Sequence, residues 1–312
     1  MERLGPRDES TPERLGELLA RCEFPPAGTA VACAVSGGAD SLALLVLAVE
    51  AGCEVTAVHV DHGLRTGSAD EAAVVRAAAE RWGADSWSLR VDVGPGPNLE
   101  ARARAARYAA LPPGALTGHT ADDQAETVLL NLLRGAGLGG WAGMGPARRP
   151  IRRLRRSETR ALCAEVGLEP VDDPSNADPA FRRNRVRHEL LPLLDAIAER
   201  DVVPVLARQA DLARADVALL DDLAAALDPA DAEALAAAPP ALGQRAVRLW
   251  LRAGGPGGDE HHPPDAATVE RVLAVARGEA VACELPGGWR VARTKRRLRL
   301  EAPATTQRGD GH

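Results

Sequence analysis

The stretch Ser36-Gly37-Gly38-Ala39-Asp40-Ser41 decides the fold, because it separates an apolar run at 31–35 from a helix-like run at 42–47. A strand that ends in small residues and leads straight into a helix directs unpaired backbone N–H groups and the positive end of the helix dipole at one point. Glycines let the backbone approach a ligand closely, and serine hydroxyls add hydrogen-bond donors. The stretch therefore predicts a phosphate-binding loop, with a tight turn capped by Asp or Ser as the alternative. It is not a Walker loop, because the pattern GxxxxGK[ST] is absent.

A carboxylate inside such a loop, as at Asp40, repels phosphate unless a divalent cation joins the two. A second group of acids supports such a cation. The segment GHTADDQAET at 118–127 opens a helix on which Asp123 and Glu126 share one face. We therefore predict that acids of this segment are metal ligands and that His119 reaches the phosphate or the attacking group. Acids in a first turn also complement the helix dipole, so an ordinary helix cap is the alternative.

Strand-like and helix-like runs alternate along the first half of the chain. The strand-like runs lie at 28–35, 53–60, 86–93 and 114–118, and the helix-like runs at 40–51, 69–82, 98–111 and 121–134. This alternation predicts an α/β fold with a doubly wound, Rossmann-like parallel sheet. Ligands of such sheets bind at the carboxyl ends of the strands, where both the phosphate loop and the acidic segment fall.

The second half of the chain is predicted to be mostly helical. A glycine-rich loop at 135–146 precedes a helical pattern from 157 to about 252, and 254–264 has the composition of a linker. One more helix is expected at about 265–277, followed by a strand pair joined at 286–288. We therefore expect a helical region and a small C-terminal α+β appendage after the sheet.

The composition limits the class of protein. The 312 residues are 46% hydrophobic, which is enough for one large and one smaller folded domain. No apolar stretch approaches the length of about 18 residues that a membrane span needs. The N-terminus has no apolar signal region, so we expect a soluble cytoplasmic protein without a membrane partner. The five cysteines form no CxxC pair, which argues against a zinc site or a dithiol redox motif.

Basic residues are clustered although the net charge is −6. Residues 148–160 contain seven arginines and one glutamate, residues 181–187 contain four arginines, and residues 290–299 contain six basic residues. Such clusters are typical of proteins that bind the phosphate backbone of nucleic acids. Solvated faces in an arginine-rich composition are the alternative.

In several segments the chain resembles the tRNA(Ile)-lysidine synthases, which are N-type ATP pyrophosphatases of the PP-loop superfamily. Those segments, in order along residues 28–200, are SGGADS (36–41), HVDHGLR (59–65), ARARAARYAAL (101–111), GHTADDQAET (118–127), LLRGAGLGGWAGM (132–144), DDPSNAD (172–178) and FRRNRVRHELLP (181–192). The first marks only the superfamily, which also contains amide synthetases and tRNA thiolases, whereas the later segments are more specific.

The resemblance implies an ATP-dependent ligase that attaches free L-lysine to C2 of the wobble cytidine in isoleucine tRNA, tRNA(Ile), with a CAU anticodon. It implies ATP as co-substrate, Mg²⁺, an adenylated cytidine intermediate, and release of pyrophosphate and AMP. The implied ATP-binding residues are Ser36, Gly37, Gly38, Ala39, Asp40, Ser41, His59 and Gly118. The implied catalytic residues are Asp40, His119, Asp123, Glu126 and Arg187, of which Asp40 and Asp123 are the implied metal ligands. The implied tRNA-binding residues are Arg152, Arg153, Arg155, Arg156, Arg183 and Arg185.

The predicted domains follow from this resemblance. They are a flexible lead-in with a short helix (1–27), a catalytic PP-loop domain (28–200), a helical tRNA-contacting region (201–253), a linker (254–264) and a small C-terminal region (265–312). Two other functions stay open: tRNA thiolation, against which the absence of a CxxC pair argues, and nucleotide binding without catalysis. For His59 a core or capping role is the alternative. The sequence does not determine the oligomeric state, and a homodimer is one alternative.

Overall fold

The structure is a computed structural model that describes residues 11–61, 68–91, 94, 99–172, 178–254 and 264–303. The chain divides into two compact units, Met1–Arg214 and Ala215–His312. The division falls within helix α10 (Val203–Ala225), whereas the sequence analysis ended the catalytic domain at residue 200. The start of α10 belongs to the first unit because Val203 and Leu206 pack there in a core shared with earlier helices.

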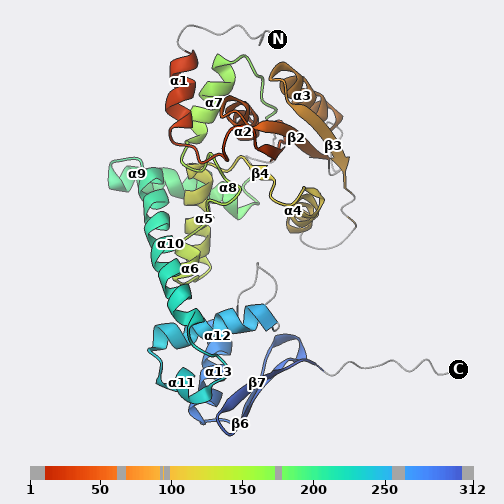
Figure 1. The fold of residues 1–312 in the computed structure, drawn as a ribbon. Helices are drawn as coiled ribbons and strands as arrows, with labels where there is room; N and C mark the ends of the chain where they lie inside the picture. The colour runs from red at the N-terminus through yellow and green to blue at the C-terminus, as the bar shows by residue number, and fades with distance from the viewer. Residues whose placement is uncertain are drawn as a thin grey trace, which may run out of the picture. The chain divides into compact units, whose positions relative to one another are not determined.

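The first unit is built on a four-stranded parallel sheet (Figure 1). Its strands are β1 (Ala30–Ala34), β2 (Glu54–Asp61), β3 (Asp85–Arg90) and β4 (Leu116–Thr117), in the order β3-β2-β1-β4. The helices that alternate with them are α2 (Ala39–Glu50), α3 (Ser68–Arg81), α4 (Leu99–Ala110) and α5 (Ala121–Leu133). The predicted doubly wound α/β sheet is thereby confirmed. The winding reverses between β1 and β4, which is where ligands of such sheets bind.

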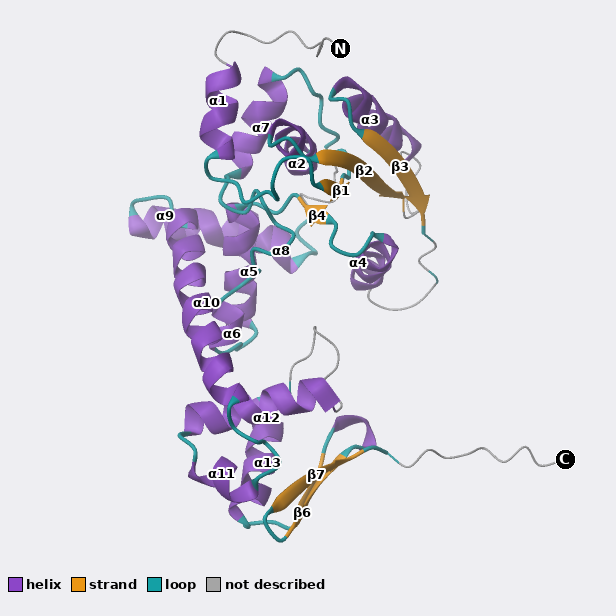
Figure 2. Ribbon diagram, viewed as in Figure 1, coloured by secondary structure: helices purple, strands orange, loops and turns teal. Residues whose placement is uncertain are grey.

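Helices cover the sheet on both faces, and alternate strand residues point to each. On one face Cys33 and Ala57 pack in a core with α1 (Thr11–Leu19) and α2. On the other face Val58 packs with Leu111, which follows α4. Figure 2 shows α2 and α3 on one side of the strands and α4 on the other. This burial on both faces explains why the run at 30–35, in the middle of the sheet, is apolar throughout.

Two helices outside the alternation complete the main core of the first unit. Helix α1 buries Leu15 and Leu18, so part of the predicted lead-in is a packed helix. Helix α7 (Arg156–Glu165) buries Leu162 in the same core. Gly167, with a φ of 65°, follows α7, so the helical pattern that was expected from 157 onward is interrupted there.

Short helices then lead to α10. Helix α6 (Leu138–Trp141) lies within the predicted glycine-rich loop. Helix α8 (Arg182–Arg185), the π-helical turn η2 (Val186–Leu190) and α9 (Leu191–Ala198) form one continuous helical segment. Val186 and Leu191 share a small core with residues of α5, so this segment lies along α5.

The second unit has its own core, which is formed by α10–α13 and a three-stranded antiparallel sheet. The elements are α11 (Ala232–Ala237), α12 (Pro240–Gly254), α13 (Ala266–Arg277), β5 (Ala282–Glu284), the 3₁₀ turn η3 (Pro286–Gly288), β6 (Arg290–Thr294) and β7 (Arg297–Glu301). The sequence predicted only a strand pair, but the second run turns back at Lys295 and Arg296. Lys295 has a φ of 57°, the positive value that a two-residue hairpin turn requires.

Across the described ranges, none of the helices combines the length and the apolar character that crossing a membrane would take.

Candidate active site

The phosphate loop at 36–41 joins the end of β1 to the start of α2. The Ser41 hydroxyl accepts a hydrogen bond from the Ser36 N–H at 3.1 Å and donates one to the Gly38 carbonyl at 2.8 Å, which closes the loop. Gly37 has a φ of 87°, which favours glycine. Gly38 is the N-cap of α2, and among the described residues no side chain caps this helix. The structure therefore differs from a turn capped by Asp or Ser, and the uncapped helix start suits an anion.

Gly118 brings the loop that precedes α5 against the phosphate loop. A Cβ atom at Gly118 would lie 2.6 Å from the carbonyl oxygen of Asp40 and 3.0 Å from Cα of Ser41. Only glycine allows this approach, because both neighbours are backbone atoms. The two loops that the sequence placed at one edge of the sheet are thus in direct contact.

Asp123 acts both as a helix cap and as a charged member of the site. One of its carboxylate oxygens accepts hydrogen bonds from the Thr120 N–H at 2.8 Å and from the Thr120 hydroxyl at 3.0 Å. The other oxygen accepts hydrogen bonds from Arg156 at 2.9 Å and from Arg183 at 3.0 Å. The capping alternative is therefore correct for one oxygen, while the second faces a cluster of charges.

Glu126 lies one turn further along α5, fully buried, and binds three arginines. Its distances are 3.1 Å to Arg156 Nη1, 2.6 Å to Arg183 Nε and 2.7 Å to Arg187 Nε. Arg183 and Arg187 are four residues apart in the α8–η2 segment and reach Glu126 from the same side. A buried carboxylate is stable only when it is paired in this way.

Arg156, at the start of α7, connects the two loops. Its Nε lies 3.4 Å from an oxygen of Asp40, whose other oxygen accepts a hydrogen bond from the Thr159 hydroxyl. With its contacts to Asp123 and Glu126, this one guanidinium bridges three carboxylates. We call Asp40, Asp123, Glu126 and the arginines 156, 183 and 187 the charge cluster.

The three acids differ in their electrostatic surroundings. Burial, together with the nearby Asp123, raises the pKa of Asp40 to about 6, although Thr159 and Arg156 oppose the rise. Burial also acts to raise the pKa of Asp123, but Arg156 and Arg183 outweigh it and hold that pKa below its usual value. The carboxylates in turn outweigh burial at Arg156 and raise its pKa. The arginines therefore gather around Asp123 and Glu126, and Asp40 is paired with Arg156.

The carboxylates fit the implied Mg²⁺ as a partial site. Mg²⁺ in nucleotide enzymes is usually held by one or two carboxylates together with phosphate oxygens and water. Asp40 and Asp123 supply two carboxylates beside the phosphate loop. Within the described residues, no group of three or more His, Cys, Asp or Glu side chains could hold a metal ion by itself. The donor set thus fits a cation whose remaining ligands come from a bound polyphosphate.

The two predicted histidines lie at the carboxyl ends of strands: His59 is near the end of β2, and His119 follows β4. His59, on β2, is buried, and its Nδ1 lies 3.1 Å from the carbonyl oxygen of Val35. Since a carbonyl only accepts, Nδ1 carries the proton, and Nε2 has no hydrogen-bond partner among the described residues. A capping role and a ligand role are therefore both compatible with His59. His119 Nδ1 lies 2.8 Å from the hydroxyl of Thr117, and its charge lowers the pKa of Asp123.

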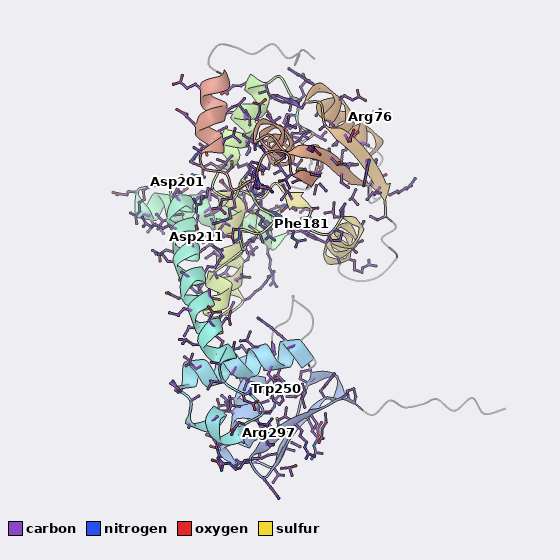
Figure 3. All side chains as sticks on the ribbon, in the orientation of Figure 1. Arg76, Phe181, Asp201, Asp211, Trp250 and Arg297 are labelled. Atoms are coloured by element: carbon purple, nitrogen blue, oxygen red, sulfur yellow. The ribbon has the colours of Figure 1, made fainter. Side chains whose placement is uncertain are left out.

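The arginines predicted to bind tRNA separate into two groups. All six bind a carboxylate of this chain, but the side chains of Arg152, Arg155, Arg156 and Arg183 are mostly buried, whereas those of Arg153 and Arg185, paired with Glu23 and Glu189, are 54% and 62% exposed. Arg152 binds Asp211 at 2.6 Å, and Arg155 binds Asp201 as well as Asp122; Figure 3 labels both Asp201 and Asp211. The first group therefore does not form the solvated arginine face considered above, and contact of any of the six with tRNA stays a prediction.

Sequence reasoning missed Thr159 and Gln124, which support the site, and it counted Asp122 among the acids of the segment GHTADDQAET without finding its arginine partner. Asp122 accepts two hydrogen bonds from the Arg155 guanidinium, at 3.0 and 3.2 Å, and one from the Arg156 N–H at 2.8 Å, which fixes the start of α7 on α5. Thr159 holds Asp40. Gln124 is buried and accepts a hydrogen bond from the Met144 N–H at 2.8 Å, which ties the glycine-rich loop to α5. The signal for Gln124 is its place between Asp123 and Glu126 in the segment GHTADDQAET.

Comparison with known proteins identifies the family. A family model described as a PP-loop domain matches residues 9–194. A tRNA(Ile)-lysidine synthase of Nocardia farcinica is 49% identical over 245 residues, which are 73% of this chain and 77% of the relative. The chain belongs to the tRNA(Ile)-lysidine synthase family. The tRNA(Ile)-lysidine synthase of Salinispora arenicola is 43% identical, over 90% of this chain and 92% of the relative. That of Mycobacterium bovis is 41% identical, over 86% of each chain. Membership in the lysidine synthase family confirms the prediction of an ATP-using ligase of the PP-loop superfamily.

Proposed function

We propose that the chain ligates L-lysine to C2 of the wobble cytidine in isoleucine tRNA with a CAU anticodon, in two steps driven by ATP. The observation that carries this proposal is the contact at Gly118, where the phosphate loop touches the loop that leads into Asp123 and Glu126. The phosphate loop, which suits an anion, is thus in contact with the loop that carries the buried acids. A reaction between a nucleotide and a cationic amine requires two such sites next to each other. The names of the relatives supply the substrate.

In the first step the O2 atom of cytidine attacks the α-phosphorus of ATP. The O2–P bond forms, the bond to the β-phosphate oxygen breaks, and pyrophosphate leaves. The uncapped start of α2 and the N–H groups of the loop would hold the departing pyrophosphate. Asp40 and Asp123 would hold Mg²⁺, which when bound neutralises charge on the phosphates. Arg187 and His119 lie at the charge cluster, where they would bind the phosphate or the adenylated base.

In the second step the ε-nitrogen of lysine attacks C2 of the adenylated cytidine. The C2–N bond forms, the C2–O bond breaks, and AMP leaves. Asp123 and Glu126 would bind the ammonium group and orient it, since buried carboxylates favour a cation. The ammonium must lose a proton before it attacks, and these carboxylates are the acceptors nearest to it.

The thiolase alternative is not supported by the cysteines. Cys163 donates a hydrogen bond to the Ala39 carbonyl in the phosphate loop at 3.4 Å, but burial raises the pKa of its thiol to about 12. Burial raises the pKa of Cys33 in β1 to about 12 as well. Sulfur transfer needs a thiolate, and these thiols stay protonated at neutral pH.

The decisive experiment is to incubate the full chain with ATP, radiolabelled lysine and a transcript of CAU-anticodon isoleucine tRNA. We expect label in the RNA and stoichiometric release of AMP and pyrophosphate. A transcript with uridine in place of the wobble cytidine is the matched control and should stay unlabelled. If the cytidine transcript also stays unlabelled while ATP is bound, the proposal is wrong. Nucleotide binding without catalysis is then the favoured function.

A further inference from the structure

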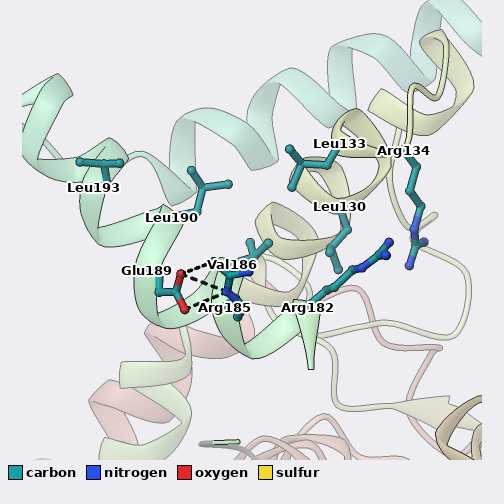
Figure 4. A pocket seen from close by; sticks show the side chains of 9 residues that line it. All are labelled: Leu130, Leu133, Arg134, Arg182, Arg185, Val186, Glu189, Leu190 and Leu193. Carbon is teal, nitrogen blue, oxygen red and sulfur yellow. Dashed lines mark hydrogen bonds and ion pairs between the residues drawn. The ribbon is translucent and has the colours of Figure 1, made fainter. Parts of the chain in front are cut away.

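A groove lies between α5 and the α8–η2–α9 segment, outside the charge cluster. It encloses a cavity of about 500 Å³. Its apolar part includes Leu133, Leu190 and Leu193, and its charged part includes Arg134, Arg182 and Arg185. Figure 4 shows Arg134 and Arg182 reaching the same end of the groove, with Leu190 and Leu193 toward the other end.

The groove and the charge cluster are both lined by arginines of the α8–η2 segment. Arg183 and Arg187 of the α8–η2 segment turn inward to Glu126. Arg182 and Arg185 of the same segment line the groove instead. A polymeric ligand that places one of its residues at the charge cluster could therefore place the neighbouring residues in this groove.

The apolar floor of the groove is open to solvent. The side chains of Leu133 and Leu193 are 68% and 55% exposed, far more than the leucines of the cores. Contiguous exposed apolar surface with a polar rim usually marks a binding site. The floor thus offers exposed apolar surface to a ligand.

The rim of the groove is positively charged. The acid that lines the groove is Glu189, and it is already paired with Arg185 at 2.8 Å. Across the described parts of the chain, neither Arg134 nor Arg182 makes an ion pair or a hydrogen bond through its guanidinium. The groove therefore has two arginines available for anions and no unpaired acid, which favours an anionic ligand over a neutral or cationic one of equal shape.

We infer that this groove binds the single-stranded nucleotides next to the target base of the RNA substrate. Single strands are bound by arginines on the phosphates and by stacking or apolar contact on the splayed bases. The inference rests on the proposed function for the identity of the RNA. It adds a binding site outside the charge cluster, made by residues that the reaction itself does not use.

The direct test is photo-crosslinking of the full chain to an RNA stem-loop with a CAU anticodon, in which 4-thiouridine replaces the uridine of the anticodon. We expect the crosslinked peptides to contain Arg134 or residues 182–193. Binding of the same RNA is then measured over a range of salt concentrations for Arg134→Ala/Arg182→Ala. The slope of log K against log salt should fall by about 1.4, since each single-strand phosphate contact contributes about 0.7.

A matched control separates this effect from the general loss of charge. Arg76→Ala/Arg90→Ala removes two exposed arginines from α3 and β3, outside the basic clusters, and its salt slope should stay near that of the unaltered chain. The apolar floor is tested by Leu133→Ser/Leu193→Ser, which should weaken RNA binding about tenfold, or about 1.4 kcal/mol.

Three outcomes would overturn the inference: crosslinks confined to other segments, equal salt slopes for the two arginine double variants, or a dimer of the unaltered chain that the leucine variant dissociates. The last would make the groove an interface between copies. Failure of lysine incorporation by the unaltered chain would instead remove the proposed function, and groove crosslinks would still report an RNA site.

Discussion

Substitution of Gly118 by alanine tests the contact on which the proposed site depends. The added Cβ would lie 2.6 Å from the Asp40 carbonyl oxygen, 2.9 Å from its carbonyl carbon and 3.0 Å from Cα of Ser41. A carbon–oxygen contact is normally no shorter than about 3.3 Å, so the two loops must separate by roughly 0.7 Å. Because only backbone atoms oppose the new methyl group, a side-chain rotation cannot relieve the overlap. Overpacking of this kind costs about 1–3 kcal/mol.

We expect this strain to lower both the stability of the chain and its affinity for ATP. We expect Gly118→Ala to lower the urea midpoint of the full chain and to weaken ATP binding at least about tenfold, or about 1.4 kcal/mol, measured by calorimetry. The matched control is Gly139→Ala in α6, where an added Cβ meets nothing within 4 Å. Alanine is favoured over glycine in a helix by about 1 kcal/mol, so the control should be neutral or slightly stabilising. An alanine at 118 that leaves both the urea midpoint and the ATP affinity unchanged would refute the contact between the two loops.

Three further predictions concern single residues. Glu126→Ala should lower the free energy of unfolding by about 3–5 kcal/mol in urea denaturation, because it leaves three arginines facing one another without their shared partner; a loss below about 1 kcal/mol would show that the pairing is dispensable. Arg152→Ala should lower the melting temperature of the chain by several degrees, because the guanidinium of Arg152 is buried in its ion pair. Arg153→Ala, at an exposed arginine, should change the free energy of unfolding by less than about 0.5 kcal/mol. Equal effects of the two substitutions would contradict this prediction. The thiol of Cys163, with its pKa raised to about 12, stays protonated at every pH below that value, so Ellman's reagent at pH 8 should react with it only in urea.

The sheet could be predicted from the sequence because its signals are local. Apolar strands, small loop residues and amphipathic helices alternate at regular spacing, and each of these signals lies within a few residues. The hairpin at Lys295 could not be predicted, because neither Lys295 nor Arg296 is a glycine or asparagine that favours a positive φ. The turn is held there by the strand pairing on both sides of it.

The acids of the candidate site could be predicted, but the partners of the arginines could not. Arg153 and Arg156 look alike in a run of arginines, yet one is exposed and the other bridges three carboxylates. What separates them is tertiary: Arg153 lies before α7, whereas Arg156 begins α7, whose Leu162 and Cys163 are fully buried in the main core. That burial depends on how α7 packs against α2, and the sequence does not show that packing.

The charge cluster also has a consequence for the order in which ligands bind. Its three carboxylates and three arginines carry formal charges that sum to zero. A cation that enters such a neutral group alone meets no excess negative charge and loses its hydration. A nucleotide in the adjoining loop adds several negative charges at once, so the demand for a cation is created by the nucleotide. Because the ion pairs are balanced, we expect the anionic nucleotide to bind before a positively charged ligand is held.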